Sequence, residues 1–150
     1  MKMEGTQMEQ KNVMTLEFMS LPENEGFARV AVSAFAVQLN PTLETLTDIK
    51  TAVSEAVTNA IVHGYREKDG IVRVEACYDD ERKLTVTVTD AGCGIPDKPR
   101  AMTPFFTTQP EKERSGMGFA VMQTFMDDVQ VVSQPGCGTK VTLVKTVAAE

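Results

Sequence analysis

The stretch 54–64, SEAVTNAIVHG, constrains the fold more than any other part of the chain, because it ends a long amphipathic pattern. The apolar side chains of this pattern recur at helical spacing and share one broad face: Leu46, Ile49, Val53, Val57, Ala60 and Ile61. Beside that face, Glu55, Asn59 and His63 recur every fourth residue and form a polar stripe. The pattern predicts a helix whose stripe is compatible with either the wall of a cleft or an ordinary solvated face.

Composition limits the class of protein. A chain of 150 residues with 42% hydrophobic residues predicts one domain with a core of ordinary size. The net charge of −6, without a block of Lys or Arg, argues against direct binding to nucleic acid. No apolar run reaches the length of a membrane span and no signal peptide precedes the fold, so we expect a cytoplasmic protein without a membrane partner. The three cysteines lack the spacing of a disulfide framework or a zinc site.

With the helix already described, the sequence predicts nine features in order along the chain. They are a strand at 13–19, helices at 20–39 and 40–63, strands at 71–78 and 84–89, a long irregular segment at 97–114, a helix opened by 115–118, and strands at 129–132 and 140–144. This order predicts an α+β fold, a two-layer sandwich in which three helices cover one face of a mixed, mostly antiparallel sheet. We expect residues 1–12 to be disordered and residues 13–146 to form the domain.

The first helix carries a second apolar pattern. Five of its side chains are expected on one buried face: Phe27, Val30, Ala31, Ala34 and Phe35. Arg29 lies off that face and is expected to be exposed. Ser20 and Glu23 match a capping box at the start of this helix, and Asn40 is the predicted N-cap of the next helix.

Glycine pairs stand where predicted elements begin or end. Gly92 and Gly94 follow a strand, Gly116 and Gly118 open a helix, and a third pair lies in the hairpin at 136–138. Glycines that open a helix bare backbone N–H groups at its positive end, where phosphate binds well. The first pair is also compatible with a plain turn, and the third is typical of one. The sequence lacks the P-loop motif, the third glycine of a dinucleotide fingerprint and the protein-kinase motif set.

Four segments in this order carry a resemblance to a known family. EAVTNAIVHG at 55–64, DAGCG at 90–94, GMG at 116–118 and GT at 138–139 resemble the N-, G1-, G2- and G3-type boxes of the GHKL (Bergerat-fold) ATPases and kinases. The longer segments PENEGFARV, SEAVTNAIVHGY, FFTTQPEKERSGMGF and FMDDV resemble the anti-sigma F serine kinases of spore-forming bacteria. The resemblance covers residues 14–145 and implies the Bergerat ATP-binding fold.

The resemblance implies roles for the polar stripe and the strand ends. Asn59 is expected to ligate Mg²⁺ through its side-chain oxygen, and Glu55 to orient or deprotonate the attacking hydroxyl. Asp90 is expected to accept a hydrogen bond from the adenine amino group of ATP or ADP. Thr139 supports the adenine end, and the two glycines that follow Asp90 let the base approach the backbone.

At the phosphate end, the resemblance implies that Gly116 and Gly118 present amides to the phosphates. Ser115 and Thr108 are expected as further contacts of a lid. Arg114 is expected to reach the γ-phosphate or the docked substrate. One arginine beside Mg²⁺ fits a transfer reaction that depends on positioning and charge stabilisation.

The single histidine excludes one kind of kinase. A sensor histidine kinase needs a phosphoacceptor His on a dimerisation helix, whereas His63 lies inside the helix of the polar stripe. The length also leaves no room for the transducer domain of gyrase-, Hsp90- or MutL-type relatives. We therefore expect a stand-alone module whose phosphoacceptor lies on another protein.

The resemblance implies a homodimeric serine kinase and anti-sigma factor. Its partners are a sporulation sigma factor of the F type and an anti-anti-sigma protein that is phosphorylated on serine. Arg29 matches the family position that contacts both partners in turn. Two alternatives stay open: a general-stress anti-sigma kinase of the same class, and an ATP-binding anti-sigma module without kinase activity.

Overall fold

The computed structural model describes residues 10–64, 70–92, 118–134 and 136–148. Within these ranges, one sheet has five strands in the order β1-β2-β3-β5-β4, and neighbouring strands are antiparallel. The strands are β1 (Gln10–Met19), β2 (Ile71–Asp79), β3 (Lys83–Asp90), β4 (Asp128–Gln134) and β5 (Gly138–Thr146). The predicted mostly antiparallel sheet is confirmed.

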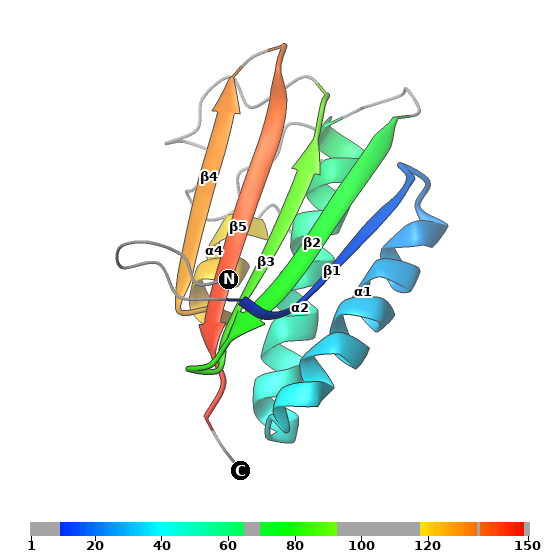
Figure 1. Cartoon of the computed structure of the whole chain (residues 1–150). Coiled ribbons are helices and arrows are strands. Elements are labelled where there is room, and N and C mark those ends of the chain that lie inside the picture. The colour runs from blue at the N-terminus through cyan, green and yellow to red at the C-terminus, as the bar shows by residue number, and fades with distance from the viewer. Residues whose placement is uncertain (1–9, 65–69, 93–117, 135, 149–150) are drawn as a thin grey trace.

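The helices lie together on one face of this sheet (Figure 1). They are α1 (Glu23–Ala36), α2 (Leu43–Asn59) and α4 (Gly118–Phe125), with a 3-10 turn η1 (Val37–Leu39) after α1 and a π-turn η2 (Ala60–Gly64) after α2. This arrangement confirms the predicted α+β sandwich of two layers. None of the helices in the described ranges has the length and apolar character that a membrane span requires.

The core fills the space between the two layers. Every second residue of the inner strands is buried against the helices: Val72, Val74, Ala76, Leu84, Val86, Val88, Val141 and Leu143. The apolar face predicted for α2 is buried from Ile49 to Ile61, and Leu46 packs at its margin. Each fully buried Val, Leu or Ile side chain of this core stabilises the fold by about 1.5–3 kcal/mol.

The face predicted for α1 is mostly wrong: of its five side chains only Phe35 is buried, Ala31 is half-buried, and Ala34 is exposed. The helix buries Ala28, Val32, Phe35 and Ala36, whereas Phe27 is 54% exposed and Val30 is 63% exposed. The reason is that α1 packs against α2 as well as the strands, so two neighbours set its buried stripe. Phe27 packs in a T-shaped arrangement with the Phe18 ring of β1, with the ring centroids 6.3 Å apart.

Both predicted helix caps are also wrong. The Ser20 hydroxyl accepts a hydrogen bond from the backbone N–H of Gly70 at 2.9 Å, and α1 begins after Pro22 without a side-chain cap. Asn40 has a φ of 50° and ends η1 in the left-handed conformation that Asn tolerates. Thr42 is the true N-cap of α2, and its Oγ1 accepts from the N–H of Thr45 at 3.1 Å.

The first strand begins earlier than predicted. β1 starts at Gln10, which pairs with Asp79, so the strand includes residues assigned to a disordered segment. The Asn12 amide helps to hold this end, because its Nδ2 donates to Gln38 Oε1 at 2.8 Å. Residues 1–9 lie outside the described ranges.

Candidate functional site

The polar stripe lies at the C-terminal end of α2. Glu55 and Asn59 are half-buried, one helical turn apart. The α-helix ends at Asn59 and passes into the wider π-turn that contains His63, whereas the sequence predicted regular helix to His63. Wide turns of this kind occur often at functional sites, because they re-aim the side chains beside them.

The N-terminus of α4 packs directly on this stripe. A Cβ atom built on Gly118 would lie 2.9 Å from Asn59 Nδ2 and 3.3 Å from Asn59 Oδ1. A side chain at position 118 would therefore force the Asn59 amide to move from this position, whereas glycine lets the helix approach it directly. The contact brings the positive end of a helix dipole beside an amide oxygen, a combination suited to an anion and its cation.

A second group of predicted residues meets where β3 ends and β5 begins. Asp90 is buried, pairs with Thr139 across the two strands, and accepts from the N–H of Gly92 at 2.9 Å. Burial raises the pKa of the Asp90 carboxyl, although the backbone N–H groups of Gly92 and Thr139 oppose the shift. A buried carboxyl with backbone donors on one side is well suited to recognise a ligand donor.

The close approach of these strand ends depends on Gly138. It has a φ of 92°, and a Cβ there would collide with the carbonyl oxygen of Asp90 and lie 2.8 Å from Ala91 Cα. On the neighbouring strand, Ser133 Oγ lies 2.9 Å from Thr139 Oγ1. Sequence reasoning missed Ser133, because only the β4–β5 register places it beside Thr139.

The two groups belong to one region of the molecule. The π-turn η2, which follows Asn59, contacts both β3 and β5, and α2 contacts α4. The described residues contain no group of three His, Cys, Asp or Glu side chains that could hold a metal. Five of the predicted site residues lie outside the described ranges: Gly94, Thr108, Arg114, Ser115 and Gly116.

Arg29 stands apart from both groups. It lies on α1, half-exposed, and its Nη1 is 3.1 Å from Glu25 Oε2. The same carboxylate oxygen accepts from Ser54 Oγ at 2.6 Å, and Ser54 directly precedes Glu55. The sequence signals the Glu25–Arg29 pair by its spacing of four residues, but nothing local signals the bond to Ser54.

Solved structures share this fold. The RsbU and RsbW domains of Rv1364c from Mycobacterium tuberculosis match 93% of the chain at 17% identity and a TM-score of 0.68, and the chain spans 34% of that structure's length. The histidine kinase domain of a blue-light activated histidine kinase from Erythrobacter litoralis matches 82% of the chain at 21% identity and a TM-score of 0.54, with 61% of that domain covered. At these identities the likeness shows the fold alone.

Sequence relatives are much closer. The anti-sigma F factor of Thermoanaerobacter pseudethanolicus is 54% identical over 95% of this chain and 99% of its own length. Those of Caldanaerobacter subterraneus and Clostridium beijerinckii are 55% and 53% identical, covering 93% and 89% of this chain and 97% and 94% of theirs. Residues 18–145 match the family described as the histidine kinase-like ATPase domain. The chain therefore belongs to the histidine kinase-like ATPase family, in its anti-sigma F factor branch.

Proposed function

We propose that this chain is an ATP- and Mg²⁺-dependent protein serine kinase that also binds and inhibits a sporulation sigma factor of the F type. Its substrate is a serine of the anti-anti-sigma antagonist of that factor. The observation that carries the proposal is the packing of Gly118, at the positive end of α4, on the Asn59 side chain. That contact supports the proposal, because helix-start amides are suited to phosphate and a side-chain amide oxygen is suited to Mg²⁺.

Asp90 is the proposed reader of the base. Adenine presents an amino donor where guanine presents a carbonyl oxygen, so a carboxylate attracts the first and repels the second. The burial of Asp90 strengthens this preference for adenine over guanine, because a hydrogen bond to a desolvated acceptor is stronger than one to an acceptor in water. We assign Thr139, which pairs with Asp90, to the same end of the site, together with Gly92 and Gly94.

Asn59 is the proposed protein ligand of Mg²⁺. Its amide oxygen is a hard ligand, and Mg²⁺ takes one or two protein ligands together with phosphates and water. When bound, Mg-ATP supplies the phosphoryl group and neutralises part of its charge.

Glu55 is the proposed base. It lies one turn before Asn59 on the same helix, so it faces the phosphate end from the same side. It would orient the substrate serine and accept its proton as the phosphoryl group is transferred. We assign the amides of Gly116, the hydroxyls of Thr108 and Ser115 and the guanidinium of Arg114 to the phosphates.

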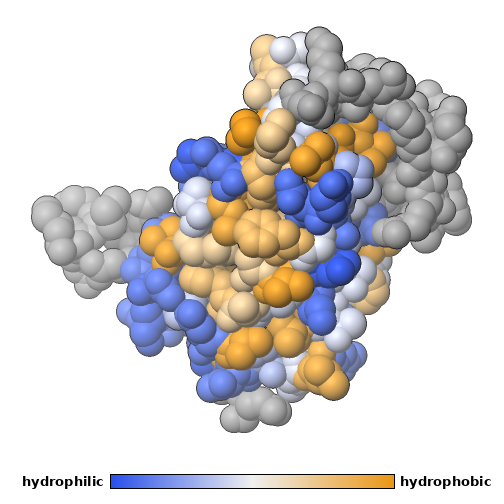
Figure 2. Space-filling model, turned by 90° about the vertical axis from the view of Figure 1, so that its right-hand side faces the viewer, coloured by the Kyte–Doolittle hydropathy of each residue, from blue (hydrophilic) through white to orange (hydrophobic). Residues whose placement is uncertain are grey.

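The protein partners are proposed to dock on α1. Arg29 is half-exposed there, and the exposed side chains of Phe27 and Val30 lie on the same helix. The molecular face on the α1 side shows apolar side chains bordered by hydrophilic ones (Figure 2). An apolar surface with a charged member is typical of a protein interface. We propose that the chain acts as a homodimer in the cytoplasm and that its domain extends to residue 146.

One experiment tests the proposal as a whole. The protein is incubated with γ-labelled ATP, Mg²⁺ and a purified anti-anti-sigma protein, and phosphorylated residues are mapped by mass spectrometry. We expect phosphoserine on the partner and none on the chain itself. Nucleotide binding in calorimetry without any transfer would identify an ATP-binding anti-sigma module, and a chain that binds no ATP would overturn the proposal.

A further inference from the structure

The placement of α4 decides whether its N-terminus meets Asn59. The helix has eight residues and spans about 12 Å, a length at which an isolated helix is marginal in water. Its position must therefore come from contacts with its neighbours. Only Met126 and Asp127 separate its last residue, Phe125, from strand β4.

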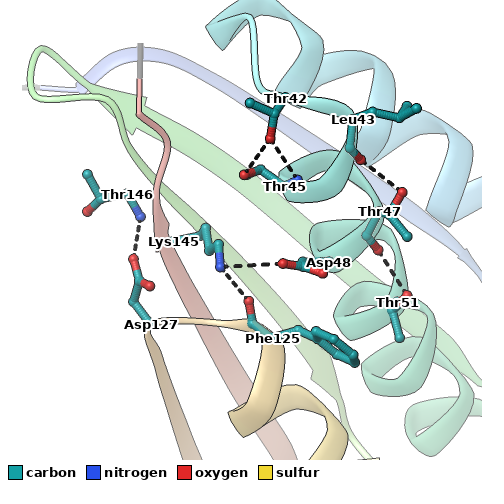
Figure 3. A network of polar contacts seen from close by, with 10 residues as sticks. All are labelled: Thr42, Leu43, Thr45, Thr47, Asp48, Thr51, Phe125, Asp127, Lys145 and Thr146. Atoms are coloured by element: carbon teal, nitrogen blue, oxygen red, sulfur yellow. Dashed lines mark hydrogen bonds and ion pairs between the residues drawn. The ribbon is translucent and has the colours of Figure 1, made fainter. Parts of the chain in front are cut away.

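Lys145 contacts the C-terminal end of α4 (Figure 3). Its Nζ donates to the carbonyl oxygen of Phe125 at 2.7 Å and lies 3.9 Å from Asp48 Oδ2 on α2. The Lys145 side chain is only 17% exposed. A cation at the C-terminus of a helix satisfies an open carbonyl and opposes the negative end of the dipole. One ammonium group thus joins β5, α4 and α2.

Asp127 bonds to the backbone on both sides of Lys145, and Figure 3 shows the bond to Thr146. The N–H of Asp127 donates to the carbonyl oxygen of Val144 at 2.8 Å, and its Oδ2 accepts from the N–H of Thr146 at 2.7 Å. These bonds flank Lys145 and hold the end of α4 at a set distance from β5. Along β5, Lys145 shares the helix-facing parity of the buried Val141 and Leu143.

The other end of α4 touches the catalytic end of α2. Phe125 lies near Asp48 through Lys145, while Gly118 lies against Asn59, so the two helices run antiparallel and are joined at both ends. Phe125 and Gly118 are the two ends of the same short helix, so a shift of α4 at Phe125 would also displace the amides at Gly118.

We propose that Lys145 is a positioning residue for ATP binding. By fixing the C-terminal end of α4 to Asp48 and β5, it keeps the N-terminal amides of α4 against Asn59. This inference rests on the proposed function for the role of those amides. The placement itself is testable without nucleotide.

The test compares Lys145→Met with Lys83→Met and Lys145→Arg. Methionine keeps an unbranched side chain that is one atom shorter and removes the charge. Lys83 is an exposed lysine at the same end of the sheet, and arginine keeps the cation. In the nucleotide-free protein, we expect faster amide hydrogen exchange in α4 for Lys145→Met, with the exchange of β2 unchanged. Lys83→Met should match the wild type, and Lys145→Arg should restore most of the protection.

Calorimetry with Mg-ATP then separates positioning from simple stability. We expect Lys145→Met to bind ATP about threefold to tenfold more weakly at a temperature where it is fully folded. Unchanged exchange in α4, or uniform loss of protection over the whole sheet, would overturn the proposal. Faster exchange in α4 with wild-type ATP affinity would overturn the link to the site. A wild-type protein that fails to bind ATP would instead count against the proposed function.

Discussion

The helices α1 and α2 pack together on the same sheet, but they place their apolar side chains differently. α2 buries Ile49, Val53 and Val57 completely and keeps a half-buried polar stripe at one end. α1 leaves Phe27 and Val30 more than half exposed. When the apolar face of a helix is buried inside the fold, its polar face remains available for a binding or catalytic site. Apolar residues that stay exposed favour contact with another protein.

The two helices also meet at a polar contact. Glu25 of α1 accepts from Arg29 on its own helix and from Ser54 of α2. The proposed docking residue Arg29 is therefore linked through Glu25 to Ser54, which directly precedes the proposed base Glu55. Substitutions on each helix show whether the two surfaces work separately.

The largest effect is expected at Glu55. Glu55→Gln should lower the rate of phosphoryl transfer by about 100- to 10,000-fold, because the base is lost, while ATP still binds. Transfer is measured with γ-labelled ATP, and affinity is measured by calorimetry. Glu44→Gln, at an exposed position in the first turn of the same helix, is the matched control. Phosphoryl transfer at the normal rate in Glu55→Gln would show that Glu55 of α2 is not the base.

Asp90, the last residue of β3, tests the part of the proposed site that binds the base of the nucleotide. Asp90→Asn should weaken ATP binding by about 10- to 100-fold, because a charged acceptor becomes neutral, and should reduce discrimination against GTP. Asp80→Asn, on an exposed turn, serves as the control. Unchanged affinity for ATP in calorimetry would exclude Asp90 from base recognition.

The same variant has a pH signature. Burial raises the pKa of the Asp90 carboxyl above its ordinary value of 3.8, so the folded state holds this proton more tightly than the unfolded state. The protonated carboxyl therefore contributes fully to stability below its ordinary pKa of 3.8. This contribution is lost as the pH rises through the higher pKa of the folded state. The free energy of unfolding of Asp90→Asn should therefore increase relative to that of the wild type as pH rises toward neutrality. A difference that is constant with pH would contradict the shift.

Arg29 tests the docking side. Arg29→Glu should weaken capture of both the sigma factor and the anti-anti-sigma protein by about tenfold, because it reverses a charge at the interface and faces Glu25. Affinity for ATP should not change. Lys50→Glu makes the same charge reversal on an exposed position of α2 and should bind both partners normally. Wild-type capture by Arg29→Glu in pull-down assays would move the interface away from α1.

The smallest effect is expected at Ser54. Ser54→Ala removes the bond to Glu25 and should lower the free energy of unfolding by about 1 kcal/mol, because the bond is only partly buried. ATP affinity and sigma-factor capture should both stay close to wild type. Thermal unfolding and the two binding assays provide the comparison. Loss of either function at wild-type stability would show that the helices are coupled through this bond.

The sequence predicts α2 well because one helical period specifies both its buried face and its polar stripe. It also places Asp90 and Thr139 at strand ends, since turn residues follow or precede them, and antiparallel pairing then joins them. The face of α1 could not be predicted in the same way, because contacts with α2 as well as the sheet decide it. The hydrogen bond between Glu25 and Ser54 joins residues far apart in the chain, so no local sequence pattern predicts it.

Lys145 occupies an intermediate position. Its parity along β5 places a charge on the buried face, which is a signal readable from the sequence, because a buried charge needs partners. The partners themselves, the Phe125 carbonyl and Asp48, follow only from the packing of α4 on α2. Local periodicity thus identifies an unusual residue, and the tertiary structure explains it.

The most direct test of the central claim uses one preparation of Glu55→Gln for two assays in the presence of Mg-ATP. Sigma-factor capture should equal that of the wild type, because α1 is intact, while phosphoserine on the anti-anti-sigma protein should fall at least about 100-fold. Loss of capture together with transfer would contradict the assignment of catalysis to α2 and docking to α1.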